Sequence, residues 1–281
     1  MIGLAPSTYY YKPKRDPLLR LRQDTELRDV IERIQVRFPG YGWRRIQRSL
    51  LRRGKRINHK RIKRIMQEYG LYSALRRQYK IRTTDSNHSY RVYPNLVLGK
   101  KLDGIDQVWA SDITYIRIEA EFVYLAAIID VYSRKIVGWA IGRTIDSILC
   151  LKALQAALKN RKPKPGCIHH SDRGLQYCSD AYVQCLREAG LKVSMCSIGS
   201  PKENAFIESF FKTLKHEEVL IRGYTTYDDI LKKVPRFIEE VYNQKRMHSA
   251  LDYASPAEFE RSLKQMKKSV RPVQKLADYF L

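Results

Sequence analysis

The first part of the chain carries three stripes of apolar positions at helical spacing. The first stripe ends at Pro39-Gly40, the second covers about residues 43–53 before Gly54, and the third begins after Asn58, a good N-cap residue. The positions expected to point inward are Leu27, Val30, Ile31, Ile34 and Phe38, then Trp43, Ile46 and Leu50, and finally Ile62, Ile65, Met66 and Tyr69. This pattern predicts three short helices.

The outer face of the third predicted helix is basic, with Lys60, Arg61, Lys63, Arg64 and Gln67 outward. A helix, a short Gly-containing turn and a second helix of this kind are typical of a helix-turn-helix, whose last helix can enter the major groove of DNA. A solvated face on a small helical bundle gives the same pattern and remains the alternative. The candidate DNA contacts in this region are Arg44, Arg45, Arg48, Lys60, Arg61, Lys63 and Arg64.

The hydrophobic period changes after a polar segment, residues 83–100, which we expect to link two domains. Three β-rich runs at 108–118, 121–131 and 135–141 predict an antiparallel meander. Further elements are expected as a helix from Ile148 to before Pro163, a strand at 166–169, a helix from Ser179 to about Ala189, a strand at 191–195 and a helix at about 203–216. The order predicts an α/β fold, a mixed sheet with helices on its faces.

The end of the chain reads as helical from Tyr227, with a last short helix that begins at Pro256 behind Ser255. The basic segment 263–281 is expected to be a loose tail, with further DNA contacts as the alternative. The expected domains are therefore 1–82, helical and DNA-binding, and 101–262, catalytic, joined by the linker 83–100 and followed by this tail.

Charge is strongly asymmetric along the chain. The whole chain of 281 residues has a formal charge of +24, and residues 1–100 hold 25 Lys and Arg against 7 acids, a net charge of +18. Such a block favours a polyanion as partner and argues against an ordinary neutral metabolic enzyme. An anionic membrane is the weaker alternative, because the longest apolar run, residues 123–129, is far too short to span a bilayer.

Five cysteines, an odd number with no C-x-x-C pair, argue against a disulfide framework or a structural zinc site. The first residues show no secretion signal, so we expect a reducing, cytoplasmic location. Neither a phosphate-binding G-x-x-x-x-G-K-[ST] loop nor a G-x-S-x-G elbow occurs in the sequence, so ATP use and acyl transfer have no support.

Three acids stand where a catalytic carboxylate cluster would need them. Asp112 lies in the first predicted strand, Asp172 follows the fourth, and Glu208 lies on a helix whose buried side carries Ile207, Phe210, Phe211 and Leu214. Carboxylates at strand ends suit Mg²⁺, and two ions can activate the attacking oxygen and stabilise the leaving oxygen of a phosphate displacement. Each acid alone has an ordinary interpretation as a solvated or turn residue.

Other polar residues near these acids are candidates for auxiliary roles. Asn204, Lys212 and Lys215 share the face of Glu208 and are candidate contacts to the DNA backbone. Asp130 is expected to support a hairpin turn, and His169 and His170 beside Cys167 are expected to serve packing or hydrogen bonding rather than metal binding. Glu203 as a fourth metal ligand is the less favoured interpretation.

Spacing and motifs together resemble a known family. Between Asp112 and Asp172 lie 59 residues, and between Asp172 and Glu208 lie 35, as in the D,D-35-E arrangement of retroviral-integrase-like transposases. The blocks F-P-G-Y-G-W-R-R-I, W-A-S-D-I-T-Y-I, H-S-D-R-G-L-Q-Y and N-A-F-I-E-S-F-F-K-T-L-K occur in the same order as in the downstream-frame (OrfB) products of the bacterial IS-three family of insertion sequences. One departure is Glu203, where the family commonly has Asp.

The resemblance implies a ribonuclease-H-like fold and a DNA transposase in which Asp112, Asp172 and Glu208 hold two Mg²⁺ (or Mn²⁺) ions. It also implies strand cleavage followed by 3′-OH strand transfer along a copy-out route, with double-stranded terminal repeats and target DNA as partners. A homo-oligomer on DNA and fusion to an upstream-frame helix-turn-helix and coiled-coil product are further expectations. A DNA-binding repressor without enzymatic activity and an RNase-H-like nuclease without strand transfer remain the alternatives.

Overall fold

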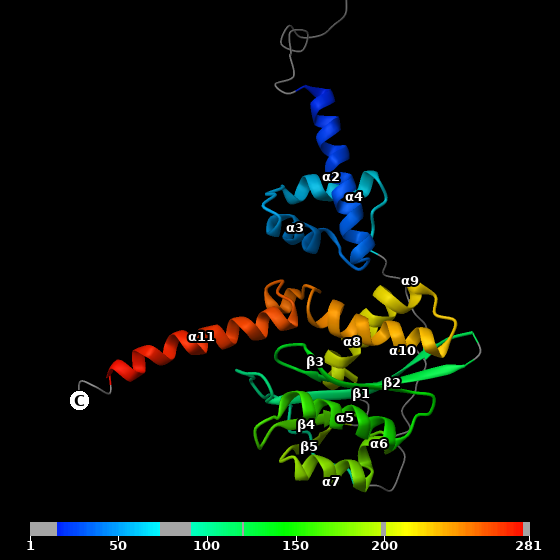
Figure 1. Ribbon diagram of the computed structural model, residues 1–281, viewed down its shortest axis with the longest axis vertical. Coiled ribbons are helices and arrows are strands. Elements are labelled where there is room, and N and C mark those ends of the chain that lie inside the picture. The colour runs from blue at the N-terminus through cyan, green and yellow to red at the C-terminus, as the bar shows by residue number, and fades with distance from the viewer. Residues whose placement is uncertain (1–15, 74–90, 120, 198–200, 278–281) are drawn as a thin grey trace, which may run out of the picture. The chain divides into compact units, whose positions relative to one another are not determined.

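The computed structural model describes residues 16–73, 91–119, 121–197 and 201–277 (Figure 1). The chain divides into two compact units, residues 1–75 and 76–281. Within the described ranges, no helix combines the length and apolarity needed to cross a membrane.

The described part of the first unit, residues 16–73, contains three helices: α2 (Pro17–Arg37), α3 (Trp43–Arg52) and α4 (His59–Glu68). Asn58 caps α4 by accepting a hydrogen bond from the Lys60 backbone N–H, as its sequence position predicts. The predicted core is confirmed at Leu27, Ile31, Ile34, Ile46, Leu50, Ile62, Ile65 and Met66, which are all buried. The inward assignment of Tyr69 was wrong: its side chain is 40% exposed, because it follows the last turn of α4 and lies under Arg28.

The second unit is built on a five-stranded mixed sheet in the order β3-β2-β1-β4-β5. The strands are β1 (Val108–Arg117), β2 (Phe122–Asp130), β3 (Ile136–Gly142), β4 (Ile168–Ser171) and β5 (Lys192–Met195), and the helices between them are α5 (Ser147–Arg161), α6 (Leu175–Cys178) and α7 (Asp180–Glu188). The first three strands pair antiparallel, while β4 and β5 run parallel to β1. The predicted meander and α/β order are confirmed. The single turn α6 is an element that the sequence did not predict.

The helical layer after β5 begins with the 3₁₀ turn η1 (Pro201–Asn204) and continues through α8 (Ala205–Leu214), the π-helix η2 (Lys215–Val219) and α9 (Leu220–Arg222). It returns through α10 (Tyr227–Arg236) and the π-helix η3 (Phe237–Asn243), followed by the 3₁₀ turn η4 (Ser249–Leu251). A buried ion pair fixes this layer, because Arg246 donates to Glu217 through Nε at 2.8 Å and Nη2 at 2.7 Å. Bidentate geometry of this kind adds rigidity as well as attraction.

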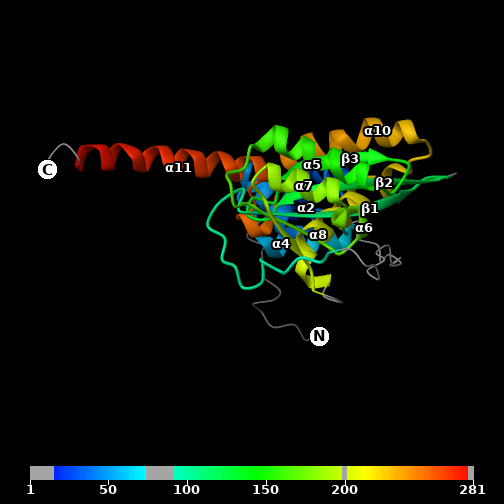
Figure 2. The ribbon, with the colours of Figure 1, turned by 90° about the horizontal axis from the view of Figure 1, so that it is seen from below.

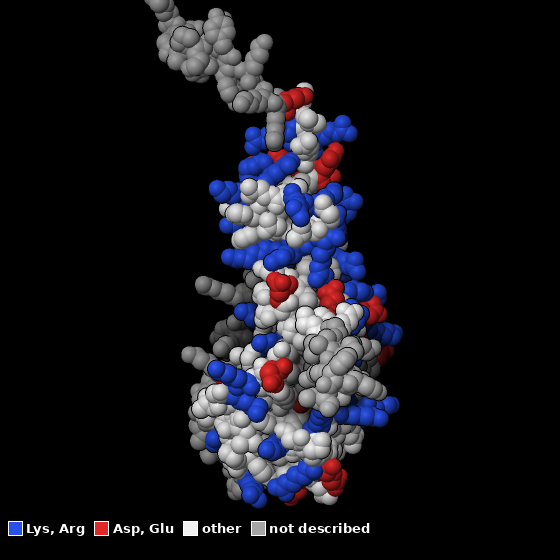
Figure 3. All heavy atoms as spheres, turned by 90° about the vertical axis from the view of Figure 1, so that its left-hand side faces the viewer, with Lys and Arg blue, Asp and Glu red and all other residues white. Residues whose placement is uncertain are grey.

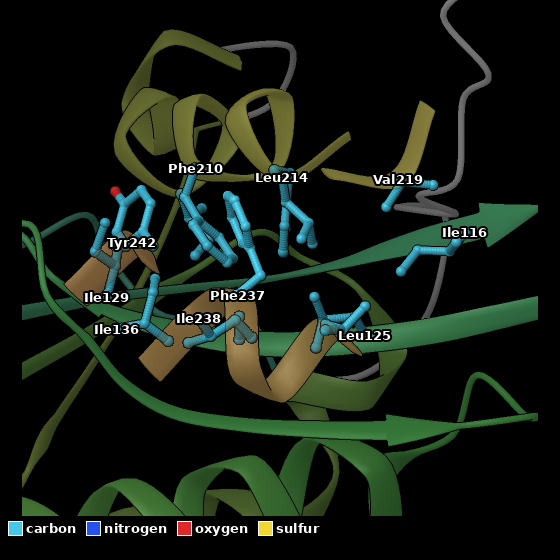
Figure 4. Close-up of a cluster of buried hydrophobic side chains, with 14 of the residues drawn as sticks. Ile116, Leu125, Ile129, Ile136, Phe210, Leu214, Val219, Phe237, Ile238 and Tyr242 are labelled. Atoms are coloured by element: carbon cyan, nitrogen blue, oxygen red, sulfur yellow. The ribbon is translucent and has the colours of Figure 1, made fainter. Parts of the chain in front are cut away.

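Helices cover both faces of the sheet and enclose two apolar cores. On one face α8, η2, α10 and η3 pack against the strands, and Figure 4 shows Phe210 and Leu214 of α8 meeting Phe237 and Ile238 of η3 above the sheet. On the other face α5 and α7 cover residues such as Trp109 and Ala126. β1 is thus held from both sides, which gives the residues on it little freedom to move.

The predicted linker packs in part on the second unit. Its first residues, 83–90, lie outside the described ranges, but Leu96 N–H donates to Ser194 Oγ at 2.9 Å and Val97 contacts the core. Residues 91–100 are therefore part of the folded surface.

The last helix is longer than the short helix that the sequence predicts. Helix α11 extends from Pro256 to Ala277, and Figure 2 shows it as one continuous helix. Ser255 and Glu258 form a capping box, since each backbone N–H donates to the other's side chain at 2.8 and 3.3 Å. Glu260 then ties its first turns to the sheet unit by accepting from both terminal nitrogens of Arg161 at 2.8 and 2.9 Å. Residues 278–281 lie outside the described ranges.

Candidate active site and DNA interface

Sheet register brings Asp112 and Asp172 to the same level. In the parallel pair β1·β4, Val108, Trp109 and Ala110 lie opposite Ile168, His169 and His170. Continuing this register by two residues places Asp112 level with Asp172, immediately after β4 ends. Because β1 and β4 are adjacent strands, the two carboxylates come from neighbouring positions on two inner strands of the sheet.

Asn204 fixes the start of α8 beside the same stretch of β1. Its side-chain Nδ2 donates to the backbone carbonyl of Ser111 at 2.9 Å, next to Asp112. Glu208 follows Asn204 by four residues, about one helical turn, so it lies above Asn204 on the same side of the helix. The helix thereby carries Glu208 toward the two aspartates, and the Glu208 side chain itself is exposed.

The three acids are close enough to influence one another electrostatically. Burial raises the pKa of Asp112 well above its ordinary value, and the negative charges of Asp172 and Glu208 raise it further. The Ile113 N–H, which donates to Asp112 Oδ1 at 2.8 Å, and the positive charge of Lys215 oppose this rise only in part. The structure thus brings together the three residues that the sequence analysis singled out.

The acids are nevertheless spaced openly. Among the described residues, a different group has ligand atoms that all lie within 4.8 Å of one another: His170, Cys196 and Glu203. The ligand atoms of Asp112, Asp172 and Glu208 are therefore spaced more widely than those of this group.

A divalent cation fits this donor set. All three side chains offer oxygen ligands, as Mg²⁺ prefers. Among the charged groups that shift the pKa of Asp112, the half-buried Lys215 is the cation, and its positive charge lowers that pKa. Asn204 Oδ1 is a further buried acceptor beside the site, with no hydrogen-bond partner among the described residues.

The three candidate DNA contacts on or next to α8 differ in their exposure to solvent. Lys212 is exposed, in agreement with a surface role, and Lys215 is half-buried with its Nζ 4.2 Å from the centre of the Tyr115 ring. Burial lowers the pKa of Lys215. Asn204 is only 4% exposed and faces β1, so the predicted contact between its side chain and DNA does not fit; its structural role is to position α8.

The remaining polar candidates serve hydrogen bonding. Asp130 is fully buried and accepts from the backbone N–H groups of Ser133 and Asp106 at 2.7 and 2.6 Å, which confirms the predicted turn role. His169 pairs with Tyr182 Oη at 2.9 Å, away from Cys167. All five cysteines are free thiols, as expected.

In the first unit, an acid on α2 organises the basic face of α4. Asp24 is 6% exposed and accepts from Arg61 Nε at 2.7 Å and from Arg64, which also forms two hydrogen bonds to Glu68 at 2.9 Å. Burial alone would raise the pKa of Asp24, but the hydrogen bonds from Arg64 and Arg61 outweigh it and the pKa is lowered. The sequence analysis missed Asp24, although its spacing from Leu27 and Ile31 places it on the inner stripe.

Exposed cations gather around Trp43 instead. Arg44 and Lys63 each lie 4.5 Å from the centre of its ring, so Trp43 is half-buried under two cations rather than simply inward as predicted. A groove of about 480 Å³ on α3 and the turn that follows it is lined by Gln47, Arg48, Leu51, Lys55, Arg56, Ile57 and Asn58. Figure 3 shows Lys and Arg crowding the visible surface of this unit.

Family models match both units. Residues 22–79 match an HTH-like domain, and residues 104–201 and 189–256 match two models of an integrase core domain. The first core range includes Asp112 and Asp172, and the second includes Glu208. The fold and these matches define a polynucleotidyl transferase core of the integrase type joined to a DNA-binding helix-turn-helix domain.

Relatives cover almost the whole chain. The insertion element IS600 uncharacterized 31 kDa protein of Shigella sonnei is 36% identical over 95% of this chain and 98% of its own length. The transposase for insertion sequence element IS904 of Lactococcus lactis is 37% identical over 85% and 96%. The transposase InsF for insertion sequence IS3A of Escherichia coli is 34% identical over 78% and 76%. The chain belongs to this IS-three family of insertion-sequence transposases.

Among solved structures, the catalytic core domain of HTLV-2 integrase in complex with magnesium matches 55% of this chain and 96% of that domain. The identity is 15% and the TM-score 0.41. This likeness is too distant for any inference about residues or chemistry.

The substitution Asp112→Asn is expected to stabilise the metal-free protein at neutral pH. Because the pKa of Asp112 is raised in the folded chain, the ionised group opposes folding as the pH rises above about 4, its unfolded value, and the penalty is complete above the folded pKa. Relief of about 1 kcal/mol corresponds to a Tm increase of roughly 2–4 °C, measured by calorimetry in the presence of a chelator. Asp180→Asn, at an exposed position on α7, is the matched control. An unchanged Tm for Asp112→Asn, or equal stabilisation of variant and wild type by Mg²⁺, would contradict the assignment.

In the first unit, Lys60 and Lys63 are expected to act on DNA binding, and Arg64 on stability. Replacing both lysines by Ala should reduce the slope of log K against log salt by about 2, because two phosphate contacts are removed. Loss of the contact between Lys63 and Trp43 should lower Tm only slightly. Arg64→Ala should instead cost about 1–3 kcal/mol of stability, since Asp24 stays buried with one partner fewer. Binding titrations at several salt concentrations and thermal melts measure both effects, with Lys192→Ala on β5 as control. An unchanged slope in the double variant would remove α4 from the interface.

Proposed function

We propose that this transposase cuts DNA at the ends of its insertion sequence and joins the resulting 3′-OH to another strand, through Asp112, Asp172 and Glu208. The observation that carries the proposal is the convergence of these acids: burial raises the pKa of Asp112, and the negative charges of Asp172 and Glu208 raise it further. Carboxylates held in repulsion in this way favour a dication as partner.

Asp112, Asp172 and Glu208 would hold Mg²⁺ or Mn²⁺. When bound between these acids, a pair of such ions activates the attacking oxygen and stabilises the leaving oxygen of an in-line phosphate displacement. Water attacks in the cleavage step and the new 3′-OH attacks in the joining step, so one site performs both reactions.

The protein's own residues set the geometry of this site. Asp112 is fixed on the central strand β1, which is covered on both faces, and Asn204 holds α8 against that strand. Lys215 and Lys212 place positive charge on the side of α8 that carries Glu208, where a DNA backbone can lie. The basic surface of the first unit holds the terminal repeats through phosphate contacts.

Two DNA ends must be handled in each reaction, so we propose that the active form is a homo-oligomer on DNA. Fusion to an upstream-frame product that carries a helix-turn-helix and a coiled coil would supply further contacts to the ends. A repressor function requires only the first unit and leaves the three acids without a role.

The test is a joining assay with labelled terminal-repeat DNA, Mg²⁺ and the full chain, with and without the upstream product. Asp172→Asn and Glu208→Gln should each reduce joined product by at least about a hundredfold, since loss of outer ligands alone costs about 10–100-fold. DNA binding should be retained, because neither acid holds DNA. Asp180→Asn, a surface Asp-to-Asn change, should leave joining unchanged.

The other outcomes distinguish the alternatives. Undiminished joining in both variants would overturn the proposal. Cutting without joining in the wild type would indicate a nuclease, and binding without either reaction would indicate a repressor.

A further inference from the structure

Beside the acid triad lies a second group of ligating side chains, on three elements that meet near the end of β4. His170 is on β4, Cys196 follows β5, and Glu203 lies in the turn η1 that leads into α8. Their ligand atoms all lie within 4.8 Å of one another, and Cys196 Sγ is 3.3 Å from His170 Nε2. From the sequence, Glu203 was the less favoured fourth ligand of the catalytic metal, His170 was expected to serve packing or hydrogen bonding, and Cys196 was not a candidate.

We propose that His170, Cys196 and Glu203 form a second metal site, for a Zn²⁺-type cation, distinct from the Asp112, Asp172 and Glu208 site. One imidazole nitrogen, one thiolate and one carboxylate form a mixed donor set that suits Zn²⁺ and differs from the all-oxygen set preferred by Mg²⁺. Metal binding at this site requires neither DNA nor the proposed reaction, so it can be measured separately.

The distances are compatible with one tetrahedral ion. Bond lengths of about 2.0–2.3 Å from Zn²⁺ to nitrogen, oxygen and sulfur place neighbouring ligands roughly 3.4–3.6 Å apart. The His170–Cys196 pair, at 3.3 Å, is slightly closer than that spacing. Glu203 is half-buried while the other two are 1% and 7% exposed; its ligand atom, within 4.8 Å of theirs, needs to approach by up to about 1.4 Å, and water can fill the fourth position.

Hydrogen bonds already orient two of the ligands. His170 Nδ1 lies 2.9 Å from Ser194 Oγ, and donation from Nδ1–H to this hydroxyl leaves the Nε2 lone pair for a metal. Glu203 Oε2 accepts from Asn95 Nδ2 at 2.8 Å and from Ser197 N–H at 2.6 Å, which leaves Oε1 as the ligand atom. Such outer partners are what a bound metal requires to hold its ligands in place.

The position of the site gives it a consequence for the triad. His170 precedes Asp172 by two residues, and Glu203 precedes Glu208 by five. An ion bound here would join the end of β4 to the start of α8, and so fix two of the triad acids relative to each other. It would therefore stabilise the fold locally without taking part in the reaction.

The experiment measures Zn²⁺ binding to the metal-stripped full chain with Mg²⁺ in large excess, by competition with a chromophoric chelator. The wild type and Asp112→Asn should bind one equivalent with equal affinity, while Cys196→Ser and Glu203→Gln should each bind at least tenfold more weakly. Cys185→Ser, at another half-buried thiol on α7, is the matched control and should bind as the wild type does. Co²⁺ in place of Zn²⁺ should give a thiolate charge-transfer band that Cys196→Ser lacks.

Zn²⁺ should also raise the Tm of the wild type but not of Glu203→Gln, a half-buried position whose substitution should leave the fold intact. Equal Zn²⁺ affinity in the wild type, Cys196→Ser and Glu203→Gln, or a Co²⁺ spectrum without the thiolate band, would overturn the proposal. Loss of the equivalent in Asp112→Asn would assign the ion to the acid triad instead. None of these readouts uses joining activity, so failure of the transposase mechanism would be seen separately.

Discussion

Repulsion among Asp112, Asp172 and Glu208 is the constraint on which the second unit depends. A fold does not normally gather carboxylates at the end of a buried strand, because each ionised group raises the cost of the next. Here β1 is covered on both faces, β4 brings Asp172 level with Asp112, and Asn204 holds the helix of Glu208 in place. The packing thus maintains an arrangement that is unfavourable in itself and becomes favourable when a cation is bound.

The first unit has the opposite imbalance of charge. There the excess is positive, and a single buried acid, Asp24, gathers Arg61 and Arg64 and so lets α4 lie against α2. Other cations lie at the surface around Trp43, where a polyanion can reach them. Counting basic residues on a helix therefore overstates its DNA contacts, because some of the cations hold the fold together.

Much of this organisation was predictable because it depends on local patterns and spacing. The helices of the first unit, the meander and the mixed sheet follow from periodicity, and the 60-position offset between Asp112 and Asp172 equals the offset of the β1·β4 register. Features set by contacts distant in sequence were not predictable in the same way. The sequence indicates that Asn204 is a polar surface residue, whereas in the structure it hydrogen-bonds to β1. The residues His170, Cys196 and Glu203 come from three separate segments of the chain. The start of the last helix behind Ser255 was predictable, whereas its extent to Ala277 was not, because the segment after residue 262 is basic in composition.

The most direct test of the central claim is to locate the metal. Crystals of the full chain soaked in Mn²⁺ should show anomalous density between Asp112, Asp172 and Glu208, with carboxylate oxygens of all three as ligands or hydrogen-bonded to ligand waters. The absence of density between these acids at saturating Mn²⁺ would contradict the account that a catalytic cation relieves their repulsion, whether or not an ion binds at His170, Cys196 and Glu203.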